Sequence, residues 1–354
     1  MRAAIIGVPK SGKSMVFAAA TGLTVDPFAP PEPKQAVVRV PDPRLKYLIE
    51  LNNPKKVTEA TFELVDVPGC SLEDAKGRDE WRRMLPTVRQ AELLVVVVRD
   101  FRNDSVPAYR NRIDAQADFD EVWAELMFSD LEAVANRIEK LEKSLKKPTA
   151  THELEKHELG LLTRCKEALE ADRPIATALH TENDRKTFAS FAFLTQKPLL
   201  CVRNVSDDAA SAASPLKADH AAACMVMSAS IEAEIAQLDP ADRPSFMAEL
   251  GLKEAARDRL AHTCYDALGL ISFLTMGPDE VRAWTIRKGS TAVEAAGKIH
   301  TDLARGFVRA ETVAYDDLVA HKDMKGAKAA GKVRKEGKSY VVADGDVMLI
   351  LANA

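Results

Sequence analysis

The sequence is short of cysteine, of net charge and of long apolar runs, and each shortage excludes a class of protein. Its five cysteines are scattered and contain no Cys-x-x-Cys pair, which argues against a disulfide framework and a zinc site and suits a reducing cytoplasm. The formal net charge is -4, so the protein as a whole is not basic and its overall charge does not indicate binding to nucleic acid. The longest strand-like run, Leu93 to Val98, is far too short for a membrane span. We therefore expect a cytoplasmic protein, not bound to membranes and without a signal peptide, because the N-terminus leads directly into a strand.

A phosphate-binding pattern occupies residues 7–14, which read Gly-Val-Pro-Lys-Ser-Gly-Lys-Ser. It follows a predicted strand at 3–6 and precedes a predicted helix at 15–20, the context that a P-loop requires. The two glycines let backbone N–H groups point inward, so that a polyphosphate sits on the loop and on the helix N-terminus. A simple glycine-rich turn does not explain why Lys13 and Ser14 follow Gly12 directly. The predicted nucleotide-binding residues here are Gly7, Lys10, Ser11, Gly12, Lys13, Ser14 and Met15.

Two of these residues have defined expected roles. Lys13 would reach the β and γ phosphates, and the Ser14 hydroxyl would hold a magnesium ion that bridges them. Lys10 has two open interpretations: it adds a positive charge over the phosphates, or it points to solvent.

Strand and helix signals alternate along the first hundred residues. Apolar runs of strand length lie at 3–6, 63–65, 93–98, 198–202 and 224–227. The β-branched run at 93–98 is typical of a parallel strand covered on both faces. Strands separated by helices predict an α/β fold, a P-loop NTPase with a doubly wound, mainly parallel sheet.

Between about 119 and 185 the sequence predicts helices and no strand. A heptad-like seam on a charged helix consists of Leu131, Val134, Ile138, Leu141 and Leu145. Pro148 breaks this helix. A second helix, with Thr151 as its N-cap, carries on one side Leu154, Leu161, Leu162, Cys165 and Leu169. The charged outer faces favour a protruding antiparallel hairpin, a coiled coil, over two surface helices lying on the sheet.

A third region begins near Gly277. Its β-like stretches at 283–286, 306–313, 340–342 and 347–351 flank one predicted helix at 291–303, and Asp344-Gly345 marks a turn. This pattern predicts a small α+β unit. A chain of 354 residues allows two or three domains. We expect a nucleotide-binding domain at 1–118 and 186–276, an inserted helical hairpin at 119–185 and a C-terminal domain at 277–354.

Two further motifs follow predicted strands. Asp66 begins Asp-Val-Pro-Gly after the strand ending at Val65, where an acid can hold magnesium and the Gly69 amide can donate to a γ phosphate. An ordinary Asp-x-Pro-Gly turn is the alternative. Asn204 and Asp207 follow the strand ending at Val202, as in the base-reading Asn-Lys-x-Asp element of regulatory GTPases, but Val205 replaces its lysine.

The base itself stays open between guanine and adenine. A carboxylate suits guanine, which offers N1–H and a 2-amino group, whereas adenine presents an acceptor at N1. Ser228 and Ala229 follow the next strand and fit the backbone element that closes over the base. The predicted metal ligands are Ser14 and Asp66, with Mg2+ as cofactor and ATP or GTP as ligand.

With these motifs, the chain resembles the YchF / Obg-like ATPase family over essentially its whole length. The resemblance is sharpest at 277–286, 295–302 and 336–346, which look like the family's TGS domain, and residues 130–141 look like the start of its helical insertion. It implies a GTPase-like core, a helical hairpin and a C-terminal, β-grasp-like TGS domain. It also implies ATP hydrolysis in preference to GTP, and ribosome or RNA association with roles in translation and the stress response.

The departures from the family concern the hydrolytic machinery. The family has Asn in place of Lys10, and a threonine of its first switch is absent from the segment 27–30. Its catalytic histidine aligns with Ala108, and its base motif ends in Glu in place of Asp207. These changes spare phosphate binding and remove parts that position water. We therefore expect a divergent paralogue that binds nucleotide well and hydrolyses it slowly.

Residues 321–338 form a basic segment, with seven Lys or Arg against Asp323 and Glu336. It either contacts RNA phosphates or is a solvated loop. Sparse aromatics argue against sequence-specific reading of RNA, and no reading of DNA sequence is expected. His300 is expected to cap or pair structurally.

Two functional hypotheses follow, with a monomer favoured. The first is a nucleotide-switched translation or stress factor with weak ATPase or GTPase activity. The second is a nucleotide-binding scaffold that acts through its hairpin and TGS surfaces. A metabolic kinase is remoter, because no acceptor pocket or arginine-bearing lid is recognisable.

Overall fold

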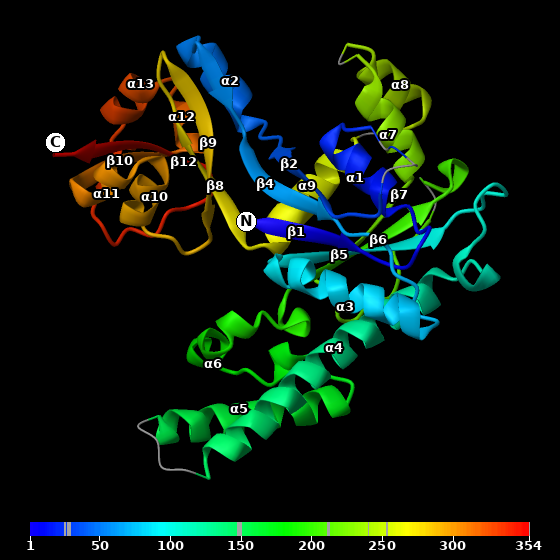
Figure 1. The fold of residues 1–354 in the computed structure, drawn as a ribbon. Helices are drawn as coiled ribbons and strands as arrows, with labels where there is room; N and C mark the ends of the chain where they lie inside the picture. The colour runs from blue at the N-terminus through cyan, green and yellow to red at the C-terminus, as the bar shows by residue number, and fades with distance from the viewer. Residues whose placement is uncertain are drawn as a thin grey trace. The chain divides into compact units, whose positions relative to one another are not determined.

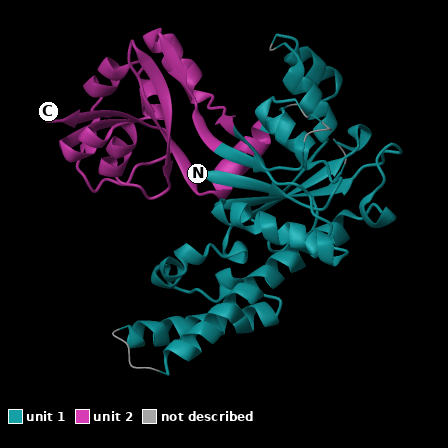
Figure 2. Ribbon diagram, in the orientation of Figure 1, with its two compact units in different colours: residues 1–36, 63–257 teal, residues 37–62, 258–354 magenta. Residues whose placement is uncertain are grey.

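The computed structural model describes residues 1–24, 26, 30–146, 151–210, 213–239, 241–252 and 254–353. The chain folds into two compact units (Figure 2). The N-terminal unit comprises Met1–Ala36 and Glu63–Arg257, and the C-terminal unit comprises Val37–Phe62 and Asp258–Ala354. The residues of the predicted hairpin, 119–185, fall within the N-terminal unit, and residues 37–62 fall within the C-terminal unit. The division into three domains, at 1–118 with 186–276, 119–185 and 277–354, stays a prediction.

The first sheet has six strands in the order β2-β4-β1-β5-β6-β7 (Figure 1). Its strands are β1 (Arg2–Ile6), β2 (Lys34–Val40), β4 (Ala60–Asp66), β5 (Leu93–Asp100), β6 (Leu199–Val205) and β7 (Ala223–Met227). The pairs β4–β1, β1–β5, β5–β6 and β6–β7 are parallel. Leu93 to Val98 are all buried, as a β-branched parallel strand covered on both faces requires. The predicted doubly wound sheet is confirmed.

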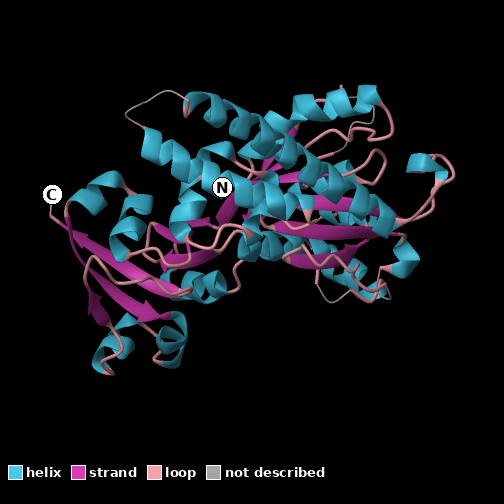
Figure 3. Ribbon diagram, turned by 90° about the horizontal axis from the view of Figure 1, so that it is seen from below, coloured by secondary structure: helices cyan, strands magenta, loops and turns pink. Residues whose placement is uncertain are grey.

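Helices flank this sheet (Figure 3). The α-helices described in the N-terminal unit are α1 (Lys13–Thr21), α3 (Ala75–Gln90), α4 (Ala115–Ser144), α5 (His152–Glu170), α6 (Glu182–Thr187), α7 (Ala229–Gln237) and α8 (Arg243–Glu249). Trp81 of α3 and Phe119, Val122 and Leu126 of α4 pack in one core cluster with β1, β4 and β5. Helix α1 packs against α7. The carboxyl ends of β1, β4, β5, β6 and β7 thus meet at one edge, where ligands bind in open α/β sheets.

Helices α4 and α5 form the hairpin, and the residues described between 119 and 185 contain no strand. Val134 and Leu141 of the predicted seam are buried against Leu161, Leu162 and Cys165. The second helix differs from expectation at Leu154, which is 72% exposed and takes no part in this core. Pro148 lies outside the described residues. Figure 1 shows the hairpin extending away from the first sheet.

The second sheet has six strands in the order β11-β10-β12-β8-β9-β3. Its strands are β3 (Lys56–Thr58), β8 (Leu270–Thr275), β9 (Glu280–Arg287), β10 (Phe307–Ala314), β11 (Arg334–Glu336) and β12 (Asp346–Ala352). The C-terminal unit's helices are α2 (Arg44–Asn52), most of α9 (Ala256–Ala267), α10 (Ala292–Ile299), α11 (Thr301–Arg305), α12 (Tyr315–Ala320) and α13 (Met324–Ala329). Ala292, Ala295 and Ala296 of α10 pack on the sheet. Because β8 belongs to it, this sheet starts before the predicted boundary at 277.

Two details of the third region were predicted wrongly. The expected helix at 291–303 is two helices, because His300 is extended (φ -162°) and its Nδ1 accepts from Asp302 N at 3.3 Å. The capping role predicted for His300 is thereby confirmed. The stretch 340–342 forms only an isolated bridge, between Val341 and Thr291. The basic segment 321–338, for which a solvated loop was one of two open alternatives, contains α13 and β11.

Candidate nucleotide site

The loop between β1 and α1 has the backbone of a phosphate cradle. Gly7 and Gly12 have φ of 147° and 91°, and a Cβ at Gly7 would meet the Val97 carbonyl oxygen at 2.4 Å. A Cβ at Gly12 would meet Asn204 Nδ2 at 2.1 Å. Both positions therefore require glycine. Lys10 is exposed and left-handed (φ 63°), a conformation that side chains other than those of Asn and Asp rarely adopt.

Lys13 is 6% exposed, and its Nζ donates to the Val8 carbonyl at 2.8 Å. Burial lowers its pKa to about 8, against the opposing attraction of Asp66 and Cys70. A Cβ on Gly69 would lie 2.5 Å from this Nζ and 2.9 Å from Pro9 Cα, so the Asp-Val-Pro-Gly segment contacts the loop directly. The structure thus brings Gly69 to Lys13, as the spacing of the two motifs along neighbouring strands implies.

Asp66 and Ser14 meet at the end of β4. Asp66 is 6% exposed and accepts a hydrogen bond from the Ser14 side chain. Burial raises its pKa, while Ser14, Lys13 and Lys34 oppose that shift. Its buried Oδ1 has no hydrogen-bond partner. A carboxylate oxygen without a donor beside a hydroxyl is the oxygen-rich setting that magnesium prefers, so these residues fit the predicted ion.

A cavity of about 550 Å³ adjoins the cradle. Six predicted site residues line it: Lys10, Gly12, Met15, Asn204, Asp207 and Ala229. Asn204 links the loop after β1 to the N-terminus of α7. Its Nδ2 donates to Ser11 O at 3.1 Å, and its Oδ1 accepts from Ala229 N at 3.0 Å. Asp207 accepts hydrogen bonds from Ser228 and Ser230. Ser11 is buried and its Oγ has no partner.

No motif in the sequence marks the wall of this cavity that is formed by the loop after β5. That wall contains Phe101, Arg102, Asn103 and Val106. Buried Arg99 holds it, because Nε donates to Phe101 O at 3.1 Å and Nη2 to Val106 O at 3.0 Å. Its guanidinium also lies 4.4 Å from the Phe101 ring centroid. The only sequence signal was position, immediately after a central parallel strand.

The same loop continues to Ala108 and then joins the segment after Gly69. The hydroxyl of Tyr109 accepts from Leu72 N at 3.1 Å and donates to Glu121 Oε1 at 2.9 Å. Arg110 Nη2 donates to the same Glu121 oxygen at 2.6 Å. Burial raises the pKa of Tyr109, so the hydroxyl stays protonated as a donor. Ala108 itself offers no group for proton transfer. The first-switch residues 27–29 lie outside the described residues.

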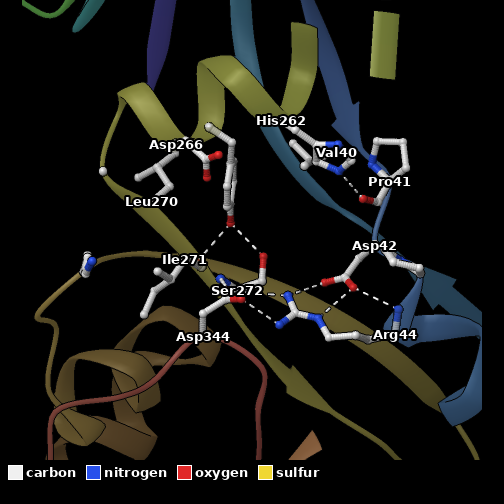
Figure 4. A pocket seen from close by; sticks show the side chains of 14 residues that line it. Val40, Pro41, Asp42, Arg44, His262, Asp266, Leu270, Ile271, Ser272 and Asp344 are labelled. Atoms are coloured by element: carbon white, nitrogen blue, oxygen red, sulfur yellow. Dashed lines mark hydrogen bonds and ion pairs between the residues drawn. The ribbon is translucent and has the colours of Figure 1, made fainter. Parts of the chain in front are cut away.

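A second cavity, of about 670 Å³, lies within the C-terminal unit (Figure 4). Arg44 pairs there with Asp42 at 2.8 Å and with Asp344 at 2.7 Å. Tyr265 donates to Ile271 O at 3.0 Å. A Cβ on Gly345 (φ 82°) would meet Arg44 Nη1 at 2.6 Å, so the Asp344-Gly345 turn needs its glycine. These bonds join residues 42–44, β8 and the turn into one framework.

The parallel sheet, the cradle at the end of β1 and the polar residues at the neighbouring strand ends together define a P-loop NTPase. Comparison with known proteins narrows this class. The chain is 40% identical to the "Ribosome-binding ATPase YchF" of Bacillus subtilis (strain 168), covering 98% of each chain. It is 36% identical to the protein of the same name from Escherichia coli O157:H7, covering 99% of this chain and 98% of that one. The chain belongs to the YchF family.

Two further matches agree with this assignment. Residues 270–353 match the family model YchF-GTPase_C, a protein of unknown function (DUF933). A solved structure of the Schizosaccharomyces pombe YchF GTPase superimposes with a TM-score of 0.85 at 28% identity, covering 99% of this chain and 97% of that one. Among the described residues, no helix combines the length and apolarity needed to cross a bilayer.

Proposed function

We propose that this chain is a magnesium-dependent NTP hydrolase that prefers ATP, turns over slowly and associates with the ribosome. The observation that carries the proposal is the cradle itself: a glycine-shaped loop, a buried Lys13 and an unpartnered Asp66 oxygen within one site. Relatives named ribosome-binding ATPases support the nucleotide and the partner.

Phosphate binding would use groups that are already in place. Lys13 Nζ now donates to a neutral carbonyl, and a phosphate oxygen would give this cation a charged acceptor, which makes a stronger hydrogen bond. Ser14 and Asp66 would hold the magnesium ion, which supplies charge neutralisation at the phosphates when bound. The Gly69 N–H would donate to the γ phosphate, since this residue contacts Lys13.

Slow turnover is proposed from the side chains at positions 108 and 109, where the family resemblance places the catalytic group. Ala108 stands where the family resemblance places a histidine, and a methyl group can neither accept a proton nor orient water. Loss of a positioned acid–base group typically costs about two to four orders of magnitude in rate. Tyr109 cannot replace it in this position, because its hydroxyl is already bonded to Leu72 and Glu121.

The hydrolysis proposal is tested by single-turnover ATP hydrolysis with magnesium, with and without ribosomes. We expect a rate well below that of the Bacillus subtilis relative measured in parallel, and an increase of about 10² or more in Ala108→His. A wild-type rate equal to the relative's contradicts slow turnover. Tight ATP binding with no hydrolysis in either condition favours the nucleotide-binding scaffold instead.

Ribosome contact is proposed for the basic segment 321–338. Among the residues described, Lys322, Lys325, Lys328, Lys335 and Lys338 are exposed and have no ion-pair partner. Lys332 and Arg334 are paired, with Asp317 and Asp346. Unpaired lysines give salt-dependent binding to RNA phosphates without reading the bases.

A further inference from the structure

The carboxylate of Asp207 receives both of its hydrogen bonds on one oxygen. Oδ1 accepts from Ser228 Oγ at 2.5 Å and from Ser230 Oγ at 2.7 Å. A carboxylate oxygen offers about two acceptor sites, so these hydroxyls fill Oδ1. Within the described part of the chain, Oδ2 has no donor. Asp207 is exposed and lines the 550 Å³ cavity, which leaves one oxygen available to a ligand.

The two purines make different demands on this carboxylate. Guanine presents two adjacent donors, N1–H and the 2-amino group, and both are satisfied when each carboxylate oxygen accepts one. Because Oδ1 already accepts two hydrogen bonds, one of the two guanine donors would lose its hydrogen bond to water and find no free acceptor on the carboxylate. Such an unsatisfied donor is unfavourable. Adenine has one exocyclic amino group and an acceptor at N1, so a single free oxygen is enough for it.

The two serines that fill Oδ1 are not equivalent. Ser228 is 2% exposed and is the N-cap of α7, with its Oγ accepting from Ile231 N at 3.4 Å. Ser230 is exposed in the first turn of α7 and also lines the cavity. Its hydroxyl contacts only Asp207 and Ser228 Oγ, the latter at 3.0 Å. Ser230 can therefore lose its hydroxyl without loss of a helix cap.

We propose that Ser230 is a specificity-determining residue that disfavours guanine by occupying the Asp207 oxygen that two-donor recognition needs. This inference rests on the proposed binding of nucleotide in this cavity. The base preference then depends on which oxygen of the Asp207 carboxylate is free to accept a hydrogen bond, and not only on the presence of an acid at this position.

The test measures dissociation constants for ATP, GTP and ITP with magnesium. The variants are Ser230→Ala, Ser230→Thr and, as a remote control on an exposed serine of α8, Ser245→Ala. Ser230→Ala should tighten GTP relative to ATP by about three- to tenfold, the worth of one hydrogen bond. ITP should change little, because hypoxanthine lacks the 2-amino group and offers only N1–H. Ser230→Thr keeps a hydroxyl, so it and Ser245→Ala should keep the wild-type ratio.

An unchanged GTP-to-ATP ratio in Ser230→Ala overturns the inference, as does an equal gain for ITP. Lys13→Ala separates this failure from failure of the proposed function. If wild type binds ATP and Lys13→Ala does not, an unchanged ratio overturns the role of Ser230 alone. If wild type binds neither ATP nor GTP, or Lys13→Ala binds both as tightly, both proposals fall.

Discussion

At the scale of single residues, Lys13 carries its positive charge at a buried position, where desolvation destabilises the charged form of the side chain. A pKa of about 8 in place of 10.5 corresponds to roughly 3 kcal/mol against the charged form in the folded protein. Because the unfolded chain binds the proton more tightly, this cost is fully present below pH 8 and is relieved as the pH rises toward 10.5. Lys13, the residue proposed to bind phosphate, therefore lowers the stability of the nucleotide-free protein.

Lys13→Met should stabilise the nucleotide-free protein by about 3 kcal/mol at pH 7 and abolish nucleotide binding. The gain in stability should shrink as the pH is raised from 8 toward 10, because wild-type Lys13 then loses its proton in the folded state. Urea unfolding across this pH range measures it. Lys10→Met, at an exposed lysine of the same loop, should show no such pH-dependent gain.

Which site residues the sequence could reveal depended on whether they carried a motif. Lys13, Ser14 and Asp66 stand at fixed offsets from strand ends, and parallel strands bring such ends together. Phe101 and Arg99 have no such pattern, and their roles depend on two backbone carbonyls that only the folded loop brings to the guanidinium. The Asp207–Ser230 contact was equally hidden, because it joins the segment after β6 to the first turn of α7.

At the scale of elements, the loop after β5 and the segment after Gly69 are joined by Tyr109. Tyr109→Phe should leave the buried Leu72 N–H without its partner and cost about 1–3 kcal/mol in the free energy of unfolding. Hydrogen exchange at the Leu72 amide should become faster. The matched control is Tyr47→Phe, whose exposed hydroxyl donates to Lys322 O and should matter less. Equal losses in both variants would contradict the special role of Tyr109.

The hairpin offers a second comparison, between two leucines of opposite burial. Leu141→Ala should cost about 2–5 kcal/mol, because this side chain is 2% exposed between α4 and α5. Leu154→Ala should change the unfolding free energy by less than about 0.5 kcal/mol, because Leu154 is 72% exposed. Thermal and urea denaturation measure both. A large effect at Leu154 would show that its surface is covered in solution.

The sequence predicted elements well where the signal was local. Spacings of three and four identified the seam of α4, and the β-branched run identified β5. The break at His300 escaped notice because the apolar pattern continues through Leu303, while the interruption depends on one imidazole accepting from Asp302 N. Strand β3 was not predicted either, since its parallel partner β9 lies far along the chain.

At the scale of the whole molecule, the net charge is -4, but the basic segment 321–338 carries an excess of positive charge. Replacing Lys325 and Lys328 by Ala should weaken ribosome binding and reduce its dependence on salt. Replacing Lys55 and Lys56, which pair with Asp279 and Glu280, changes the net charge equally and should have a smaller effect. Sedimentation with ribosomes at several salt concentrations tests this, and equal effects of the two pairs would refute the assignment to segment 321–338.

The amide of Asn204 has a thermodynamic consequence. One side chain touches the backbone that would receive the triphosphate and the backbone that would close over the purine. Pyrophosphate and adenosine, offered as two fragments, should therefore bind cooperatively: the first fragment to arrive orders the pocket for the second. Without the Asn204 amide, the two fragments should bind weakly and independently of each other. In the intact protein, the same two groups joined in one nucleotide should bind tightly.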